Sequence, residues 1–467
     1  MNPNFEKISK NKYRLEKTSP SQPEAIFYAK ESMLPNITGD HSLEQLRNTT
    51  TLPNVVSPVV AMPDMHQGYG VPVGGVLATY NLISAGAVGM DINCGVRLLA
   101  SKLSYDEKIF NSTRLHQIIK QIENLIPIGL GGRHKKNTLN LDMKELTTQG
   151  VPFLVKKGYA TQQDVDHTEE YGCLKGASYP ELSQKAVQRA AKQLGSLGSG
   201  NHFIEIQKVA KILDASLAKN WNIFENQICI MIHSGSRALG HQTCVEHLKI
   251  FARKAPEYGI KILNRELAAL PLTTKEGQAY FAAMKACVNF AFCNRQMMTY
   301  FVRKIFQRNF KVDLPLLYDV AHNIAKWEKH RGEKILVHRK GATRALPAKH
   351  PQNPQTYLTT GHPAIIPGSM GTASYVLVGL PKNAETYHSV NHGSGRRMSR
   401  TQARKNIRQD EFSKVMKKIV YNKPFHVIAD EAPQAYKNIE EVVDTLTEIN
   451  LTKKVAKLVP LAVIKGD

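Results

Sequence analysis

Two side chains that could hold a metal ion stand close together in the glycine-rich segment 89–97. The carboxylate of Asp91 and the thiol of Cys94 are three residues apart, with glycines on either side. On a strand they would point to opposite faces, but flanking glycines favour a turn, and a turn can aim both groups at one point. A hard oxygen donor beside a soft sulfur donor suits a borderline divalent cation. The alternative is that Asp91 caps a turn and Cys94 is a small core residue.

Three histidines could complete such a site. His202 follows a Gly-Ser-Gly loop, His233 ends an apolar run typical of a buried strand, and His322 follows a short apolar run. Each of them could equally be a hydrogen-bonded core histidine. With Asp91 and Cys94 they offer more ligands than one tetrahedral ion needs, so we expect two ions that share the Cys94 thiolate. The residue types alone favour zinc, because sites built from cysteine and histidine usually hold it.

His392 lies in a different setting, rich in glycine and arginine. Gly393 and Gly395 leave room beside the imidazole, and Arg396 and Arg397 could neutralise phosphate oxygens. A neutral imidazole is a competent nucleophile toward phosphorus, and covalent catalysis splits a difficult transfer into two steps. The alternative is a glycine-rich loop with an incidental histidine. We take His392 as the candidate nucleophile.

A second glycine-rich segment, residues 366–374, resembles a cradle for a phosphate or a nucleotide. Its glycines would expose backbone N–H groups that can bind an anion. The segment is neither a P-loop nor a dinucleotide-binding fingerprint, so it indicates phosphate binding without naming the ligand.

The charge of the chain points to a polyanionic partner. Lysine and arginine number 62 against 39 acidic residues, which gives a formal net charge of +23. Such an excess favours nucleic acid or an acidic membrane surface. Arg400, Arg404 and Arg408 recur every four residues, as a basic stripe on one helical face would. Beside a histidine that handles phosphate, this stripe favours contact with an RNA or DNA backbone over a merely solvated face.

The hydrophobic pattern predicts short strands mixed with helices. Apolar residues at helical spacing predict a helix over 115–126, and the run 228–232 predicts a buried strand. A long helical region is expected over about 242–306, interrupted at its prolines. Basic helices are expected at about 400–420 and 439–450. Because the strands and helices follow no regular βαβ rhythm, we expect an α+β fold.

We expect one domain over residues 1–467, in which the glycine- and lysine-rich segment 129–176 is a surface insertion. The 6 cysteines show no CxxC spacing, which argues against a disulfide framework or a zinc ribbon. The first residues do not read as a signal peptide, and no apolar run reaches the length of a membrane span. These features predict a cytoplasmic protein without a membrane segment.

The chain resembles the RtcB family of RNA-splicing ligases from about residue 25 to its C-terminus. The motifs that carry the likeness occur in the family's order and lie at residues 62–68, 91–95, 198–202, 233–237, 322–323, 367–371 and 392–396. The resemblance implies a single large mixed α/β catalytic domain, with short strands around a central cleft for metal and nucleotide. One departure is Ser394, where the family commonly has alanine.

The resemblance also implies an activity that depends on GTP and manganese. Such ligases join RNA ending in a 2′,3′-cyclic phosphate or a 3′-phosphate to RNA with a 5′-hydroxyl, in tRNA splicing or RNA repair. By this likeness His392 would attack GTP to form a guanylyl-histidine and pass GMP to the RNA 3′-phosphate. The 5′-hydroxyl would then displace GMP from this RNA-3′-pp-5′-G intermediate. The partners implied are the RNA ends and an archease-like activator, and we expect a monomer.

By the same likeness, Asp91, Cys94 and His202 would hold one manganese ion, and Cys94, His233 and His322 would hold the other. The nucleotide contacts implied are Asp64, Asn201, His202, Phe203, Ile204, Glu205, His322, Asn323, Pro367, Gly368, Ser369, Met370, Ser374, His392, Gly393, Ser394, Gly395, Tyr436 and Lys465. The basic residues that we expect to contact RNA are Arg237, Arg396, Arg397, Arg400, Arg404 and Arg408.

Two other functions compete with this one. A metal-dependent RNA phosphatase or nuclease would keep the five ligands but would not need His392. An RNA-binding protein without activity would have a basic surface but no reason to keep the ligands and His392 together.

Overall fold

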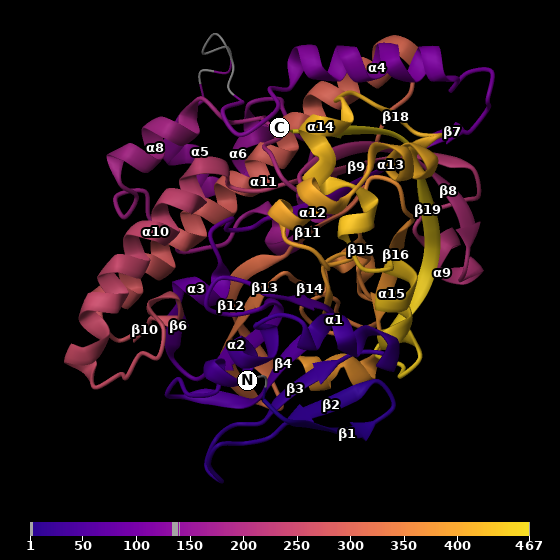
Figure 1. Cartoon of the computed structure of the whole chain (residues 1–467). Helices are drawn as coiled ribbons and strands as arrows, with labels where there is room; N and C mark the ends of the chain where they lie inside the picture. Colours follow the sequence, from indigo (N-terminus) through magenta and orange to yellow (C-terminus); the bar gives the residue numbers. More distant parts are fainter. Residues whose placement is uncertain (1–2, 133–138, 140, 467) are drawn as a thin grey trace.

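Two large β-sheets, two small ones and a set of helices make up the part of the chain that the structure describes, and Figure 1 shows their arrangement. This computed structural model describes residues 3–132, 139 and 141–466. The expected mixed α/β class is confirmed, with sheets and helices interleaved along the chain. Among the described residues no helix is both long and apolar enough to cross a membrane.

The seven-stranded sheet contains the N-terminal part of the chain, at the bottom of Figure 1. Its strand order is β1-β2-β3-β4-β5-β13-β12, and its neighbours pair antiparallel except for β3 and β4, which are parallel. The strands are β1 (Phe5–Ser9), β2 (Lys12–Leu15), β3 (Ala25–Tyr28), β4 (Val55–His66), β5 (Val73–Thr79), β12 (Asn323–His330) and β13 (Glu333–Lys340). Asp64 lies near the end of β4, so this sheet supplies one of the expected site residues.

The eight-stranded sheet positions the expected metal ligands: His233 lies on β9, and the other four lie in the segments that adjoin β7, β8 and β11. Its order is β11-β7-β9-β8-β19-β16-β15, with the short β18 paired to β19. The strands are β7 (Gly95–Ser104), β8 (Phe203–Ile212), β9 (Gln227–Ser234), β11 (Leu316–Ala321), β15 (Ala364–Ile366), β16 (Ser374–Gly379), β18 (Val420–Tyr421) and β19 (Thr452–Lys465). The predicted strand over 228–232 is β9. It is buried throughout and ends just after His233, as the apolar run indicates.

Two small sheets complete the strands. β6 (Leu82–Ser84) pairs with β10 (Ala269–Pro271), and β14 (Ala342–Arg344) pairs with β17 (Ser389–Asn391). Because β17 ends at Asn391, it fixes the point from which His392 leaves the sheet.

The predicted long helical region is two helices. The first is α10 (Arg237–Lys254), which ends just before the short helix η3 (Ala255–Tyr258) that contains Pro256. The second is α11 (Lys275–Phe310), which begins after Pro271 and is capped by the Thr274 side chain. Most of the α11 surface is buried, so this helix is a central element of the core. Other helices are α2 (Ser42–Thr49), α3 (Ala85–Val88), α4 (Ser112–Leu125), α8 (Gln184–Ala191), α9 (Ala215–Asn220) and α15 (Ile439–Thr447).

The basic region after residue 400 differs from the single helix that was predicted. It contains α12 (Arg400–Asn406) and α13 (Gln409–Met416), and the chain is extended at Ile407 and Arg408 between them. At the break, the side chain of Ile407 packs into a cluster with Phe412 and Met416. Arg408 therefore does not continue a helical stripe from Arg400, and that prediction is wrong.

Much of the segment 129–176, expected to be a surface insertion, lies in the core. It forms α5 (Met143–Gln149), α6 (Val151–Lys156), α7 (Gln162–Asp166) and η2 (Glu169–Gly172). The side chains of Leu146, Val151 and Leu154 are fully buried in the cluster that includes α11. The prediction of a surface insertion relied on the many polar residues of this stretch. Its few apolar residues lie on short helices that place them in the core. Residues 133–138 and 140 of the segment lie outside the described residues.

A pair of leucine substitutions tests this placement. Leu154→Ala should lower the free energy of unfolding by about 2–5 kcal/mol, because it opens a cavity at a fully buried position. Leu130→Ala removes the same atoms from a side chain that is 77% exposed, and should change it by less than about 0.5 kcal/mol. Chemical denaturation of the two variants measures both values. Equal effects would contradict a core role for this segment.

Candidate functional site

The predicted turn brings Asp91 and Cys94 together. The backbone N–H of Cys94 donates to the Asp91 carbonyl at 2.9 Å, and Asn93 between them has a left-handed backbone with φ of 51°. Asparagine tolerates that conformation better than most residues. Nε2 of His202 lies 2.8 Å from an Asp91 carboxylate oxygen and 3.5 Å from Cys94 Sγ. One ligand atom from each of these three residues lies within 4.8 Å of the others, as a shared cation requires.

The other two histidines lie close to these three residues. The Cys94 sulfur is 3.1 Å from Nε2 of His233, and the His233 and His322 rings are 5.5 Å apart. Nδ1 of His322 is 2.8 Å from the Thr343 hydroxyl. Nε2 of His322 is buried and has no hydrogen-bond partner among the described residues. Cys94 therefore contacts both His202 and His233, whereas His322 adjoins His233 through its ring.

The electrostatics of these groups fit a cation site. Burial lowers the pKa of His233 and His322 well below the ordinary value, so both are neutral and keep a lone pair for ligation. Burial, reinforced by Asp91, raises the pKa of the Cys94 thiol well above its usual value. Burial also raises the pKa of Asp91, but His202, Cys94 and Arg237 together more than offset this, and the net pKa is lowered. A bound cation would favour the thiolate and use the unpartnered nitrogen of His322.

His392 is held by the carboxylate of Asp64. Oδ2 of Asp64 lies 2.6 Å from Nδ1 of His392 and accepts from the backbone N–H groups of His392 and Gly393, at 3.0 and 3.2 Å. Because a carboxylate accepts, Nδ1 is the nitrogen that carries the proton, and the lone pair is on Nε2. The His392 ring is 5.3 Å from the His322 ring. The candidate nucleophile thus lies beside the candidate metal ligands.

The glycine-rich segment 366–374 lies against this histidine. A Cβ atom on Gly393 would be 3.1 Å from the Pro367 carbonyl oxygen. The Gly368 N–H donates to the Ser374 hydroxyl at 3.2 Å, which closes the segment into a loop. The amide of Gln207 donates to the same hydroxyl at 3.1 Å and to Glu205 at 2.6 Å. Gln207 was missed by sequence reasoning, although its position two residues after Glu205 on the same strand face could have indicated it.

Glu205 is a buried acid with an unusual pKa. Burial raises the pKa of its carboxyl from 4.5 to about 7, although the Gln207 amide and the Lys465 ammonium both lower it. Lys465 is buried near the end of β19. Its ammonium is 3.2 Å from Asn201 Oδ1 and 5.4 Å from the centre of the Phe203 ring. Glu205, Asn201, Phe203 and Lys465 thus lie together in one part of the site, which we call the nucleotide region.

Tyr436 joins this group through an acid that sequence reasoning missed. Its hydroxyl donates to Glu431, and Glu431 is 3.6 Å from the Lys465 ammonium. The signal for Glu431 was weak, because nothing in its local sequence indicates that an acid five residues before Tyr436 points inward.

Three predicted nucleotide contacts have other roles for their side chains. Asn323 donates to the Asp91 carbonyl at 2.9 Å and accepts from the Gly341 N–H at 2.8 Å. It therefore holds the turn of residues 91–94, which we call the metal turn. Ile204 packs in an apolar cluster on the opposite face of β8 from Glu205. Met370 packs with Phe412 in another cluster.

The arginines predicted to bind RNA divide into two groups. Arg237 and Arg396 are largely buried and engaged with the protein: Arg237 donates to Ser196 and Gly129, and Arg396 to Glu431 and the Asp430 carbonyl. The other four are Arg397, Arg400, Arg404 and Arg408, which are more exposed and also have protein partners.

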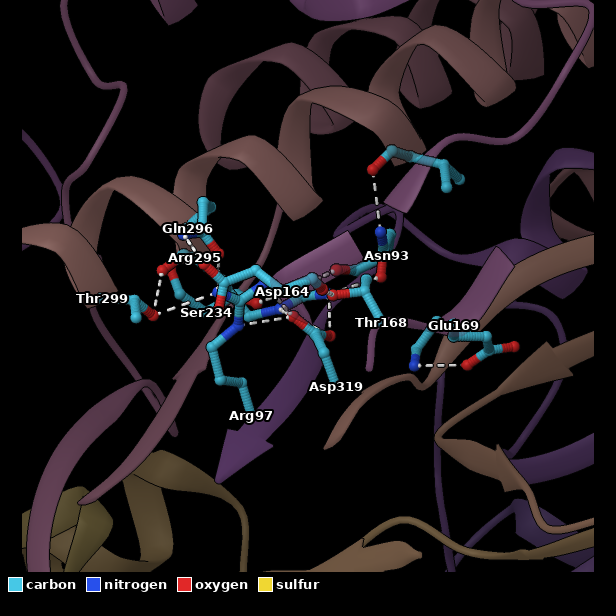
Figure 2. A network of polar contacts seen from close by, with 12 residues as sticks. Asn93, Arg97, Asp164, Thr168, Glu169, Ser234, Arg295, Gln296, Thr299 and Asp319 are labelled. Carbon is cyan, nitrogen blue, oxygen red and sulfur yellow. Dashed lines mark hydrogen bonds and ion pairs between the residues drawn. The ribbon is translucent and has the colours of Figure 1, made fainter. Parts of the chain in front are cut away.

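A fully buried ion cluster fixes the strands that carry the ligands (Figure 2). Asp319 on β11 lies between Arg97 on β7 and Arg295 on α11, with oxygen–nitrogen distances of 2.8 and 2.7 Å. The Arg295 guanidinium also donates to the carbonyls of Asn93 and Ser234, at 2.8 and 2.9 Å. One side chain therefore ties the metal turn to the end of β9 beside His233.

Neutralising this acid should weaken both the fold and the metal site. Asp319→Asn leaves two buried guanidinium groups without their counter-charge, so unfolding should become easier by about 3–5 kcal/mol. Binding of Mn²⁺ or Zn²⁺ should weaken by about tenfold or more, because the ligand-bearing segments lose their shared anchor. Denaturation and calorimetric titration measure the two effects. Asp410→Asn, which removes an exposed partner of Arg408, is the control and should change neither. Unchanged metal affinity in Asp319→Asn would contradict the positioning role.

The chain is similar to known proteins over most of its length. A family model described as tRNA-splicing ligase RtcB matches residues 45–466. The tRNA-splicing ligase RtcB of Thermococcus kodakarensis is 42% identical over 455 residues, which cover 94% of each chain. That of Archaeoglobus fulgidus is 41% identical over 458 residues, covering 95% of this chain and 94% of the relative. The RNA-splicing ligase RtcB of Mycobacterium tuberculosis is 41% identical over 438 residues, covering 90% and 100%. The chain therefore belongs to the RtcB family of tRNA-splicing ligases and is an RNA ligase.

Proposed function

We propose that this ligase uses GTP and two manganese ions to join RNA 2′,3′-cyclic phosphate or 3′-phosphate ends to 5′-hydroxyl ends, in tRNA splicing or RNA repair. The observation that carries the proposal is the 2.6 Å contact between Asp64 and Nδ1 of His392. It leaves the Nε2 lone pair as the nucleophile, beside a group of metal donors and a loop of phosphate-binding type. A phosphatase or nuclease would have no need of this pair.

In the first step, Nε2 of His392 attacks the α-phosphorus of GTP. A phosphorus–nitrogen bond forms, the bond from the α-phosphorus to the oxygen bridging toward the β-phosphate breaks, and pyrophosphate leaves. The imidazole gains positive charge as the bond forms, and the Asp64 carboxylate stabilises that charge without taking the proton from Nδ1. Asp64 is thus both the residue that fixes the tautomer and the counter-ion of the reaction.

Two transfers then complete ligation. An oxygen of the RNA 3′-phosphate attacks the phosphorus held by His392, the phosphorus–nitrogen bond breaks, and RNA-3′-pp-5′-G forms. The RNA 5′-hydroxyl then attacks the RNA 3′-phosphorus, loses its proton to solvent or a nearby base, and displaces GMP. A 2′,3′-cyclic phosphate is first opened by water to a 3′-phosphate.

The metal ligands divide into two sets in this proposal. Asp91, Cys94 and His202 would hold one ion, and Cys94, His233 and His322 would hold the other. Manganese supplies electrostatic screening of the phosphoryl groups and lowers the pKa of an attacking group. Phosphate oxygens favour a harder ion than the zinc that cysteine and histidine alone suggest.

Glu205 gives the nucleotide site a preference for guanine. Its carboxylate can accept from the N1–H and the exocyclic amine of guanine together, whereas adenine presents an acceptor at N1. Asn201, Phe203, Lys465 and Tyr436 lie around it. An archease-like activator and a monomeric state remain part of this proposal.

Labelling with GTP tests the covalent step. Wild-type protein incubated with α-labelled GTP and Mn²⁺, then denatured, should keep a label that is stable to alkali and labile to acid, as a phosphoramidate is. His392→Ala should keep none, because it lacks the nucleophile. His41→Ala is the control: it removes an exposed histidine in the N-terminal part of the chain and should label as wild type does. Wild type that stays unlabelled with every metal tried would overturn the ligase mechanism and favour the hydrolase.

The raised pKa of Glu205 predicts a pH dependence that Glu205→Gln abolishes. Between about pH 4.5 and 7 the native protein keeps a proton that the unfolded chain releases, so stability falls as the pH rises through this window. Guanine needs the carboxylate, so below pH 7 GTP affinity should fall by about tenfold per pH unit. Thermal unfolding and GTP titration between pH 5.5 and 8.5 measure both. Glu257→Gln, at an exposed position, is the control. A wild-type GTP affinity independent of pH would contradict this role.

A further inference from the structure

A large groove formed by the described residues lies outside the candidate active site. It has a volume of about 1090 Å³ and is bounded by α4, α13, β18 and β19, which cluster at the upper right of Figure 1. We call it the lysine groove. The residues that matter for its chemistry are Tyr105, Lys208, Lys414, Lys417, Lys418 and Tyr421.

The lysine groove is strongly positive. Lys414, Lys417 and Lys418 are exposed, and among the described residues none of them forms an ion pair. Glu107 is the one acid among the described residues that line the groove. In contrast, Arg404 and Arg408, which the sequence predicted to bind RNA, each face an aspartate, at 3.2 and 3.1 Å. The uncompensated charge is therefore in the groove, and it complements a polyanion.

The groove also offers aromatic and apolar surface. The Lys208 ammonium lies 4.2 Å from the centre of the Tyr105 ring, and Tyr105 stacks on Phe110 with ring centres 6.3 Å apart. Tyr421 and the apolar residues of β19 continue this surface. Aromatic faces between cations are what proteins use to bind single strands, because every base can stack on them. Base-paired RNA keeps its bases stacked on each other and cannot use such faces.

One wall of the groove is the loop that approaches His392. Gly371, Thr372 and Ala373 line the groove and belong to the segment that begins at Pro367 beside Gly393. Lys208 and its neighbour Gln207 point to opposite faces of β8, Lys208 into the groove and Gln207 toward Glu205. The groove and the nucleotide region thus share a strand and a loop.

We infer that the lysine groove binds a single-stranded segment of the RNA whose end reacts at His392. Lys414, Lys417 and Lys418 contact its phosphates, and Tyr105 stacks on its bases. This inference rests on the proposed function for the identity of the RNA and assigns the surface that holds it away from the reacting end. Charge and aromatic surface favour RNA over an acidic protein segment, which would not use the aromatic faces.

The test uses the full chain and a fluorescent single-stranded RNA of about 20 nucleotides with a 3′-phosphate. The triple variant K414A/K417A/K418A should bind it about tenfold more weakly, and the slope of log affinity against log salt should fall by about 2. The control K219A/K261A/K329A removes the same charge from exposed lysines that do not line the groove, and should bind as wild type does.

A second variant separates stacking from charge. Tyr105→Leu keeps the charge and should weaken binding of the single strand by about tenfold, because it removes a stacking face. Binding of a duplex of the same sequence should be unaffected by Tyr105→Leu. Equal loss for duplex and single strand, or a poly-glutamate peptide that binds as tightly as the RNA and is lost in the same variants, would overturn the inference.

Labelling of His392 with GTP separates failure of this inference from failure of the proposed function. The groove variants should label as wild type does, since none of their changes touches the nucleotide or metal residues. If label is retained and the groove variants bind RNA as the control triple does, the groove inference is wrong and the ligase mechanism stands. If wild type never labels yet the groove variants lose RNA binding, the surface assignment stands and the mechanism is wrong.

Discussion

The contact on which the rest of this structure depends is the buried carboxylate of Asp319 between the guanidinium groups of Arg97 and Arg295. A charge cluster of this kind contributes little net stability compared with an apolar core, because its groups must lose their hydration. What it supplies is register. Strands β7, β9 and β11 could each slide by two residues and keep their apolar faces inward, but then the carbonyls of Asn93 and Ser234 would miss Arg295. The cluster thus selects one register of the three strands, and with it one arrangement of the residues expected to bind metal.

The candidate active site lies where the two large sheets meet. β11 belongs to the eight-stranded sheet and β12 to the seven-stranded sheet, and the residue between them is His322. Asn323 then ties the crossing point to the metal turn through the Asp91 carbonyl. Asp64, on β4 of the seven-stranded sheet, orients His392. A nucleotide bound between the metal ligands and His392 would therefore contact both sheets, which keeps the reacting groups on rigid elements.

The sequence predicted which residues have reactive side chains and which local turns and strands they lie on. It did not predict which residues distant in the chain contact them. The turn at Asp91 and Cys94 follows from flanking glycines, and the placement of His233 follows from an apolar run that must end where the sheet ends. Gln207 could have been inferred from its place two residues after Glu205 on the same strand face, but Glu431 could not, because no local pattern indicates that its side chain meets Lys465. The break at Ile407 was missed because the arginine spacing suggested a continuous helix. The chain is instead extended at Ile407, whose side chain is buried.

The pairing of Asp64 with His392 joins residues 328 positions apart, and that of Lys465 with Asn201 joins residues 264 apart. Contacts of such long range form late in folding, after the loops between them have lost their entropy. Partly folded chains would then have a basic surface but neither an oriented nucleophile nor a complete nucleotide region. Such a chain could hold RNA without consuming GTP, and the capacity to react would appear in a single cooperative step.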